Sequence, residues 1–179
     1  MRKLEFVFLV FWVLQACSGS MITSTYSEMM GVRGGSRTGA HAGVDIRDKQ
    51  GAPVLAAMDG NVVWAGDTQL GCGKGVSLSH TIVSPKGSRF TLYCHLDGVD
   101  VSPRQSVRRG ERIGRVGTTG DAFGVPHIHF EASSVARAHP DGDLRDTEDP
   151  EPYFAGCFDP QQIYPTDKFL LTYPVQCTK

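Results

Sequence analysis

The residues best suited to chemistry lie in the short segment 126–131 (PHIHFE), which carries two histidines separated by one residue. If this segment is a β-strand, His127 and His129 point to one face, while Ile128 and Phe130 point to the other. Residues two apart on a strand lie about 6.6 Å from each other, so both imidazoles could reach one small ion or one reacting group. The alternative is an ordinary strand whose solvated face happens to carry histidine.

A second candidate group is the His-x-x-x-Asp pair of His41 and Asp45. Gly43 and the β-branched Val44 disfavour a helix, which would place both side chains on one face. On a straight strand the pair would lie about 13 Å apart, too far to bind one ion, so the segment must bend, and Gly43 permits a bend. Two histidines and one carboxylate with an open coordination position suit a catalytic zinc ion better than a closed structural one. A further histidine, His95, ends a run rich in strand-forming residues.

The elements that would position these residues are short strands separated by glycine-rich turns. The 21 glycines among 179 residues favour an all-β fold with many tight turns. No stretch of convincing length has helical periodicity. The predicted strands are 44–46, 53–57, 61–65, 76–80, 90–96, 111–116 and 127–132.

The N-terminus has the pattern of an export signal. A basic start, Met1-Arg2-Lys3, precedes an apolar run over 6–14 that is too short to span a bilayer. The following Leu-Gln-Ala-Cys resembles a bacterial lipobox, so we expect residues 1–16 to be removed and Cys17 to be lipidated. Ser18 resembles an outer-membrane sorting signal, which predicts a periplasmic lipoprotein held at the outer membrane through its lipid anchor. The alternative is an ordinary secretory signal cut near residues 19–20.

Four cysteines remain after Cys17, at positions 72, 94, 157 and 177. An even number in an exported chain suggests two disulfides, with three possible connectivities. Two strand-like runs joined by a turn read as a hairpin that brings Cys72 towards Cys94, so we favour this pair. The remaining pair, Cys157 and Cys177, would close the tail on itself. A zinc–thiolate site is the competing use, but the chain has no Cys-x-x-Cys.

Charge and length narrow the function classes. The net charge of −1 gives no basic patch for nucleic acid, and no second hydrophobic stretch suggests a membrane span. Removal of the leader would leave a chain long enough for one domain with its own core. The sequence does not indicate an oligomeric state.

Taken together, these segments resemble the lysostaphin/LytM-type zinc metallopeptidases, which cut the peptide part of bacterial peptidoglycan. The matching segments, in order, are AHAGVDI (40–46), GAPVLAAMDGNVVWAG (51–66), LYCHL (92–96), VRRGERIGRVGTTG (107–120) and PHIHFE (126–131). The resemblance implies antiparallel β-sheets with the site in a groove on one sheet. It also implies a peptidase domain over 31–154, while the serine, threonine and methionine content of residues 17–30 indicates a linker before it. Residues 155–179 would form a cystine-stapled C-terminal extension.

The resemblance also assigns roles within the site. His41, Asp45 and His129 would hold one zinc ion per chain and leave one position for water. His95 and His127 would be the catalytic histidines that do not bind the metal. Spacing alone does not distinguish His127 from His129 as the ligand; that assignment comes from the family.

Three other residues are open or unassigned. Glu131 could support one of the histidines or face solvent. His80 and His139 have no partner motif, so we expect both at the surface.

We therefore expect a zinc endopeptidase that acts on the peptide stems of peptidoglycan. A binding or hydrolase-activating module of the same fold is one alternative, because some relatives have lost metal ligands. A wall-tethering lipoprotein that holds peptidoglycan without cutting it is another. The sequence does not indicate which cross-link bond is cut.

Overall fold

The computed structural model describes residues 22–28, 39–82, 87–135 and 146–177, and within them the chain is almost entirely β-structure. The predicted all-β, antiparallel fold is confirmed. Among the described residues, no helix is long and apolar enough to cross a membrane. The elements in chain order are β1 (Ile22–Ser24), β2 (Val44–Arg47), β3 (Pro53–Leu55), β4 (Gly60–Asp67), β5 (Lys74–Ile82), β6 (Gly87–Val99), β7 (Ser106–Val107), β8 (Arg112–Val116), the 3-10 helix η1 (Gly120–Ala122), β9 (His127–Ser133), β10 (Thr147–Glu148) and the 3-10 helix η2 (Glu151–Tyr153).

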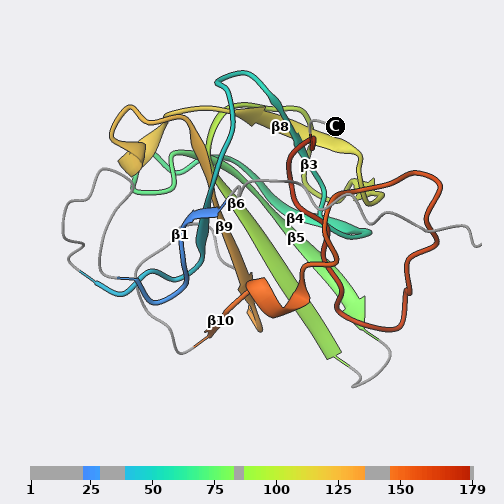
Figure 1. Cartoon of the computed structure of the whole chain (residues 1–179). Helices are drawn as coiled ribbons and strands as arrows, with labels where there is room; N and C mark the ends of the chain where they lie inside the picture. Colours follow the sequence, from blue (N-terminus) through green and yellow to red (C-terminus); the bar gives the residue numbers. More distant parts are fainter. Residues whose placement is uncertain (1–21, 29–38, 83–86, 136–145, 178–179) are drawn as a thin grey trace, which may run out of the picture.

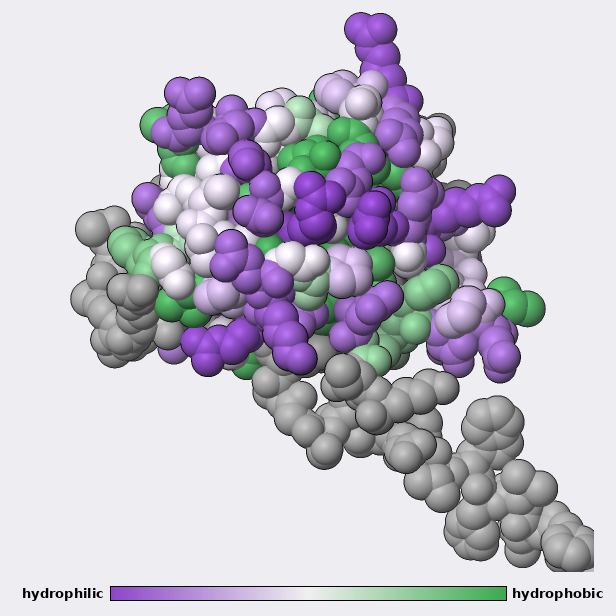
Figure 2. All heavy atoms as spheres, turned by 90° about the horizontal axis from the view of Figure 1, so that it is seen from above, coloured by the Kyte–Doolittle hydropathy of each residue, from purple (hydrophilic) through white to green (hydrophobic). Residues whose placement is uncertain are grey.

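The strands form one antiparallel sheet in the order β1-β2-β9-β6-β5-β4-β7 (Figure 1). The long strand β6 lies near its centre and pairs with β5, β8 and β9. Its last residues leave β9 and pair with β8, which in turn pairs with β3. Strands β3 and β8 therefore lie across one end of the main sheet. The outer face over this end is mostly hydrophilic, with small separate apolar patches (Figure 2).

The core lies between the main sheet and the elements that cover it. Its largest side chains include Tyr93 of β6 and Phe130 of β9, which are completely buried and meet edge to face with ring centroids 5.1 Å apart. Burying side chains of this size contributes roughly 1.5–3 kcal/mol each. On β9 the predicted alternation is present, since Ile128 and Phe130 join this core. The opposite face of β9 is also buried, so its histidines do not lie on a solvated surface.

The C-terminal segment packs over the core near β3. Leu171 and Val175 are buried, and Val175 forms an isolated bridge with Val54. Within this segment the described residues make only isolated bridges, at Leu171 and Val175, and Pro174 between them has no N–H to extend a ladder.

Both predicted disulfides are present. Cys72 is joined to Cys94, and Cys157 is joined to Cys177. The second pair closes the C-terminal tail on itself, as expected. Both pairs span loops of similar length, with sequence separations of 22 and 20 residues.

Two sequence expectations differ from the structure. Residues 22–24 of the expected linker form β1, which pairs with β2. His80 is not a surface residue: its side chain is 1% exposed, and its two ring nitrogens contact the Asp59 carbonyl and the Thr91 hydroxyl. The expected signal peptide, Cys17 and His139 lie outside the described residues.

Candidate metal centre

Three of the predicted site residues come together where β2 lies beside β9. Asp45 on β2 is directly opposite His129 on β9, and His41 lies just before β2. The close approach of the chain here depends on Gly43, because a Cβ at this position would lie 2.2 Å from the backbone oxygen of Phe130. Gly43 was expected to permit a bend. The structure adds a second reason for glycine here, which is its close contact with the backbone of β9.

The ligand atoms of this triad form a small triangle. His41 Nε2 lies 3.1 Å from Asp45 Oδ1 and 2.9 Å from His129 Nδ1, and the third side, from His129 Nδ1 to Asp45 Oδ1, is 3.1 Å. All three residues are buried. Three ligands bound tetrahedrally at about 2.0–2.1 Å from zinc would lie about 3.3–3.4 Å apart. The triangle is therefore close to the shape that one zinc ion requires.

In His41 and His129, the ring nitrogen that points away from the triad determines the tautomer, and therefore what the other ring nitrogen presents to the triad. His41 Nδ1 lies 2.7 Å from the carbonyl oxygen of Thr25, and His129 Nε2 lies 3.1 Å from Glu131 Oε1. Both oxygens accept, so each of these nitrogens must carry a proton. In the neutral rings, His41 Nε2 and His129 Nδ1 then present lone pairs to the Asp45 carboxylate. With both rings neutral, three acceptors would converge, an arrangement that a cation between them, either a proton or a metal ion, stabilises.

Electrostatics point to the same conclusion. Burial would lower the pKa of His129, but hydrogen bonds and charges from Asp45 and Glu131 outweigh it and raise that pKa to about 9. Burial would raise the pKa of Asp45, yet its hydrogen bonds to His129 and His41 hold that pKa well below its usual range. The triad therefore favours positive charge beside an ionised Asp45. A divalent metal ion supplies such charge, and its binding would displace the proton from His129.

Glu131 contacts one of the candidate ligands, His129, and does not face solvent. It is 0% exposed and contacts His129 at the nitrogen that points away from the triad. A carboxylate in this position fixes the tautomer and orientation of the histidine. This was one of the two possibilities that the sequence left open.

His95 and His127 lie together beside the triad. Their ring centroids are 4.7 Å apart, and His127 Nε2 lies 3.7 Å from Asp45 Oδ1. His127 Nδ1 donates to the carbonyl of Val125 at 2.8 Å, and His95 Nδ1 donates to that of Thr119 at 2.9 Å. When neutral, each ring therefore keeps its lone pair on Nε2. Burial, with the charges of His127 and His129, lowers the pKa of His95 to about 3, so that ring is neutral at neutral pH.

His95 reaches this position through a β-bulge that the sequence did not predict. Between Tyr93 and Leu96, β6 advances three residues while β5 advances two, from Val76 to Lys74. His95 has a positive φ of 66°, which costs about 1–3 kcal/mol for a residue other than glycine. Because of the extra residue, Tyr93 and Leu96 both face the core, while His95 turns to the site.

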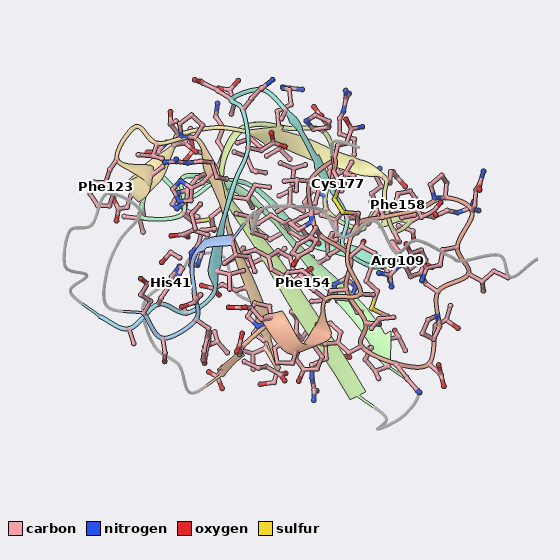
Figure 3. All side chains as sticks on the ribbon, viewed as in Figure 1. His41, Arg109, Phe123, Phe154, Phe158 and Cys177 are labelled. Atoms are coloured by element: carbon pink, nitrogen blue, oxygen red, sulfur yellow. A yellow bond between two sulfur atoms is a disulfide. The ribbon has the colours of Figure 1, made fainter. Side chains whose placement is uncertain are left out.

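A surface cavity is lined by Thr119, the residue whose carbonyl contacts the His95 ring. It has a volume of about 560 Å³ and lies between residues 67–73, at the end of β4 and in the β4–β5 loop, and residues 119–121. Leu70, which lines the cavity, is 62% exposed, and the nearby Phe123 is 65% exposed. Figure 3 shows His41 and Phe123 on the same side of the molecule, away from the C-terminal disulfide. Leu70 and Phe123 therefore leave apolar side chains exposed near this cavity, whereas the triad itself is buried.

Residues 39–140 match the family model described as Peptidase family M23. The cell division protein DipM of Caulobacter vibrioides is 38% identical over 89 residues, which cover 50% of this chain and 14% of DipM. The DD-carboxypeptidase/endopeptidase Mpg of Neisseria meningitidis is 39% identical over 92 residues, covering 51% of this chain and 20% of Mpg. The murein hydrolase activator NlpD of Escherichia coli is 31% identical over 97 residues, covering 54% of this chain and 24% of NlpD. The chain thus aligns with less than a quarter of each of these relatives.

Two solved structures have a similar fold. The catalytic domain of the antimicrobial peptidase lysostaphin from Staphylococcus simulans has a TM-score of 0.52 at 26% identity, covering 74% of this chain and 87% of that domain. A zinc-containing peptidase from Vibrio cholerae has a TM-score of 0.51 at 33% identity, covering 66% of this chain and 34% of that protein. The predicted resemblance to lysostaphin-type peptidases is confirmed.

Proposed function

The chain belongs to peptidase family M23, and on that premise we propose that it is a zinc metallopeptidase that hydrolyses peptide cross-links in bacterial peptidoglycan. The observation that carries the proposal is the convergence of three lone-pair donors, from His41, Asp45 and His129, with two further histidines beside them. The donor set fits zinc in type, number and spacing. One zinc ion per chain would leave a coordination position open.

The residues of the site would have separate roles in metal binding and in proton transfer. Zinc held by the triad would lower the pKa of a water molecule and polarise the scissile carbonyl. His95 and His127 offer Nε2 lone pairs beside the triad, and one of them accepts the proton of the attacking water. As the C–N bond breaks, the same proton passes to the leaving nitrogen, which departs as an amine. The backbone carbonyls of Thr119 and Val125 hold the two rings in the orientation that this transfer needs.

A second candidate function is activation of another wall hydrolase. Similarity to the relative named as the murein hydrolase activator NlpD favours this function. The complete set of ligands and catalytic histidines favours hydrolysis instead, because an activator does not require a metal with an open position.

Defined dimeric muropeptides would separate the two functions. The zinc-loaded protein should convert them to monomers, detected by mass spectrometry as products that together gain one water. Substrates with a direct D-alanine–diamino acid link and with a glycine bridge would identify the bond that is cut. Asp45→Ala should lose both zinc and products. Zinc binding without products from any substrate would contradict the peptidase function, and fragments that form only when a second hydrolase is added would support activation.

We also propose that the protein is exported and anchored through a lipid on Cys17, on the periplasmic side of the outer membrane. The lipobox-like segment before Cys17 supports this location. Cys17→Ser should move the protein from the membrane fraction to the soluble fraction. Equal membrane association of both proteins would contradict the anchor.

A further inference from the structure

We propose that the Cys72–Cys94 disulfide, together with Thr119, positions His95 for catalysis. The inference rests on the proposed function, in which His95 acts at the reaction centre. It concerns how the bulge that carries His95 is held in place, and it does not involve the metal ligands.

Cys72 is attached to the bulge at two successive residues, Cys94 and His95. Cys94 is the residue immediately before His95, and its sulfur ties β6 to the β4–β5 loop through Cys72. The backbone N–H of His95 also donates to the carbonyl of Cys72 at 2.9 Å. Cys72 therefore contacts the bulge once through a covalent bond and once through a hydrogen bond. Both attachments oppose relaxation of the positive φ at His95.

Thr119 completes the support from the other side of the ring. Its carbonyl accepts from His95 Nδ1, which sets the tautomer of the ring. Its hydroxyl accepts from the N–H of Lys74 at 2.9 Å and donates to the carbonyl of Leu96 at 2.8 Å. Thr119 thus connects the start of β5, the residue after His95 and the ring itself.

The two loops that carry this support pack as one unit. The N–H of Asp121 donates to the carbonyl of Gly71 at 2.8 Å. Gly73, at a φ of 63°, lies so close that a Cβ would be 2.5 Å from the backbone nitrogen of Gly120. A side chain at residue 73 would therefore separate the loops.

The disulfide also takes part in the local apolar packing. Cys72, Cys94 and Leu92 form a small buried cluster of their own, distinct from the main core. Because this cluster is separate from the main core, loss of the sulfur–sulfur bond should loosen the bulge before it affects the rest of the sheet.

The chain provides a matched control in its second disulfide. Cys157 and Cys177 close a loop of nearly the same length, with a sequence separation of 20 residues against 22. Figure 3 places Cys177 in the C-terminal segment, away from His41 and the site. Removal of either pair should lower the unfolding midpoint by a similar amount, since the loop entropies are similar.

The first experiment compares the double variants Cys72→Ala/Cys94→Ala and Cys157→Ala/Cys177→Ala well below their unfolding midpoints. Removal of the first pair should lower kcat by about 10- to 100-fold, the scale expected for misplacing a catalytic group by about 1 Å. Its KM and zinc content should stay near those of the wild type. Removal of the second pair should leave kcat nearly unchanged. Equal kcat values for the two double variants would overturn the proposal.

The second experiment uses single substitutions that leave both disulfides intact. Thr119→Val removes the bridging hydroxyl and should lower kcat. Thr119→Ser keeps that hydroxyl, so its kcat should stay near that of the wild type. Imidazole ¹⁵N shifts should show the Nδ1–H tautomer of His95 in the wild type and in Thr119→Ser. That signature should be lost in Thr119→Val and in Cys72→Ala/Cys94→Ala.

The ¹⁵N readout does not depend on turnover. If the wild type binds zinc but cuts no muropeptide, the proposed function fails, and the ¹⁵N signature alone decides how His95 is held. If the wild type is active and His95 keeps its tautomer and kcat in all these variants, the positioning role is refuted while the peptidase function stands.

Discussion

Acidification from pH 7 to pH 5 should destabilise the protein through the buried His80. Burial, together with the nearby charge of Arg109, lowers the pKa of His80 to about 4, while its value in the unfolded chain is 6.5. Both ring nitrogens are used in the folded protein, by the Asp59 carbonyl and the Thr91 hydroxyl. Protonation would place a charge in a site that is closed to water.

The sign and size of the change in the free energy of unfolding follow from proton linkage. Between pH 6.5 and 4 the unfolded chain binds the proton and the folded protein does not, so the contribution of His80 to stability is lost as the pH falls through this window. At pH 5 the unfolded histidine is almost fully protonated and the folded one is mostly neutral. The resulting loss between pH 7 and pH 5 is about 2 kcal/mol, and the full shift corresponds to about 3 kcal/mol.

Urea unfolding at pH 7 and pH 5 would measure this loss in the wild type and in His80→Gln. The variant is less stable at pH 7, but it lacks the titrating ring, so its stability should fall less on acidification. Other groups titrate equally in both proteins and cancel in the comparison. The wild type should lose about 2 kcal/mol more than the variant between the two pH values. Equal losses would refute the assignment of a neutral, buried His80.

Three further predictions concern the site. Glu131→Gln should weaken zinc binding by about 10- to 100-fold, measured by competition with a chromophoric chelator, because His129 loses its charged support; unchanged affinity would contradict that role. His95→Ala and His127→Ala should each keep zinc and lose turnover by about 100-fold or more, and loss of zinc from either would show that it is a ligand. Gly43→Ala should lower the unfolding midpoint in a thermal melt, since its Cβ would lie 2.2 Å from a backbone oxygen of β9; an unchanged midpoint would exclude that contact.

Local patterns were sufficient to predict the fold and much of the site. The alternation in 126–131 predicted a strand with two histidines on one face, and β9 has that arrangement. The hairpin expected around Cys72 and Cys94 brings the two cysteines together because β5 and β6 are sequence neighbours that pair directly. Such features depend on contacts between residues that are close in sequence, or on a clear two-residue alternation of polar and apolar side chains.

The features that the sequence did not reveal depend on contacts with distant segments. His80 is buried because Asp59, Thr91 and Phe169 surround it, and no motif marks that environment. The bulge at His95 requires a positive φ at a histidine, which local propensity disfavours and only the surrounding contacts impose.

Anomalous diffraction at the zinc edge from crystals of the zinc-loaded protein would test the central claim, that three atoms of this chain form a catalytic metal site. We expect one strong peak per chain within about 2.0–2.2 Å of His41 Nε2, Asp45 Oδ1 and His129 Nδ1, with no bond to His95 or His127. A peak bound by His95 or His127 in place of His129, or no peak at the triad, would contradict it.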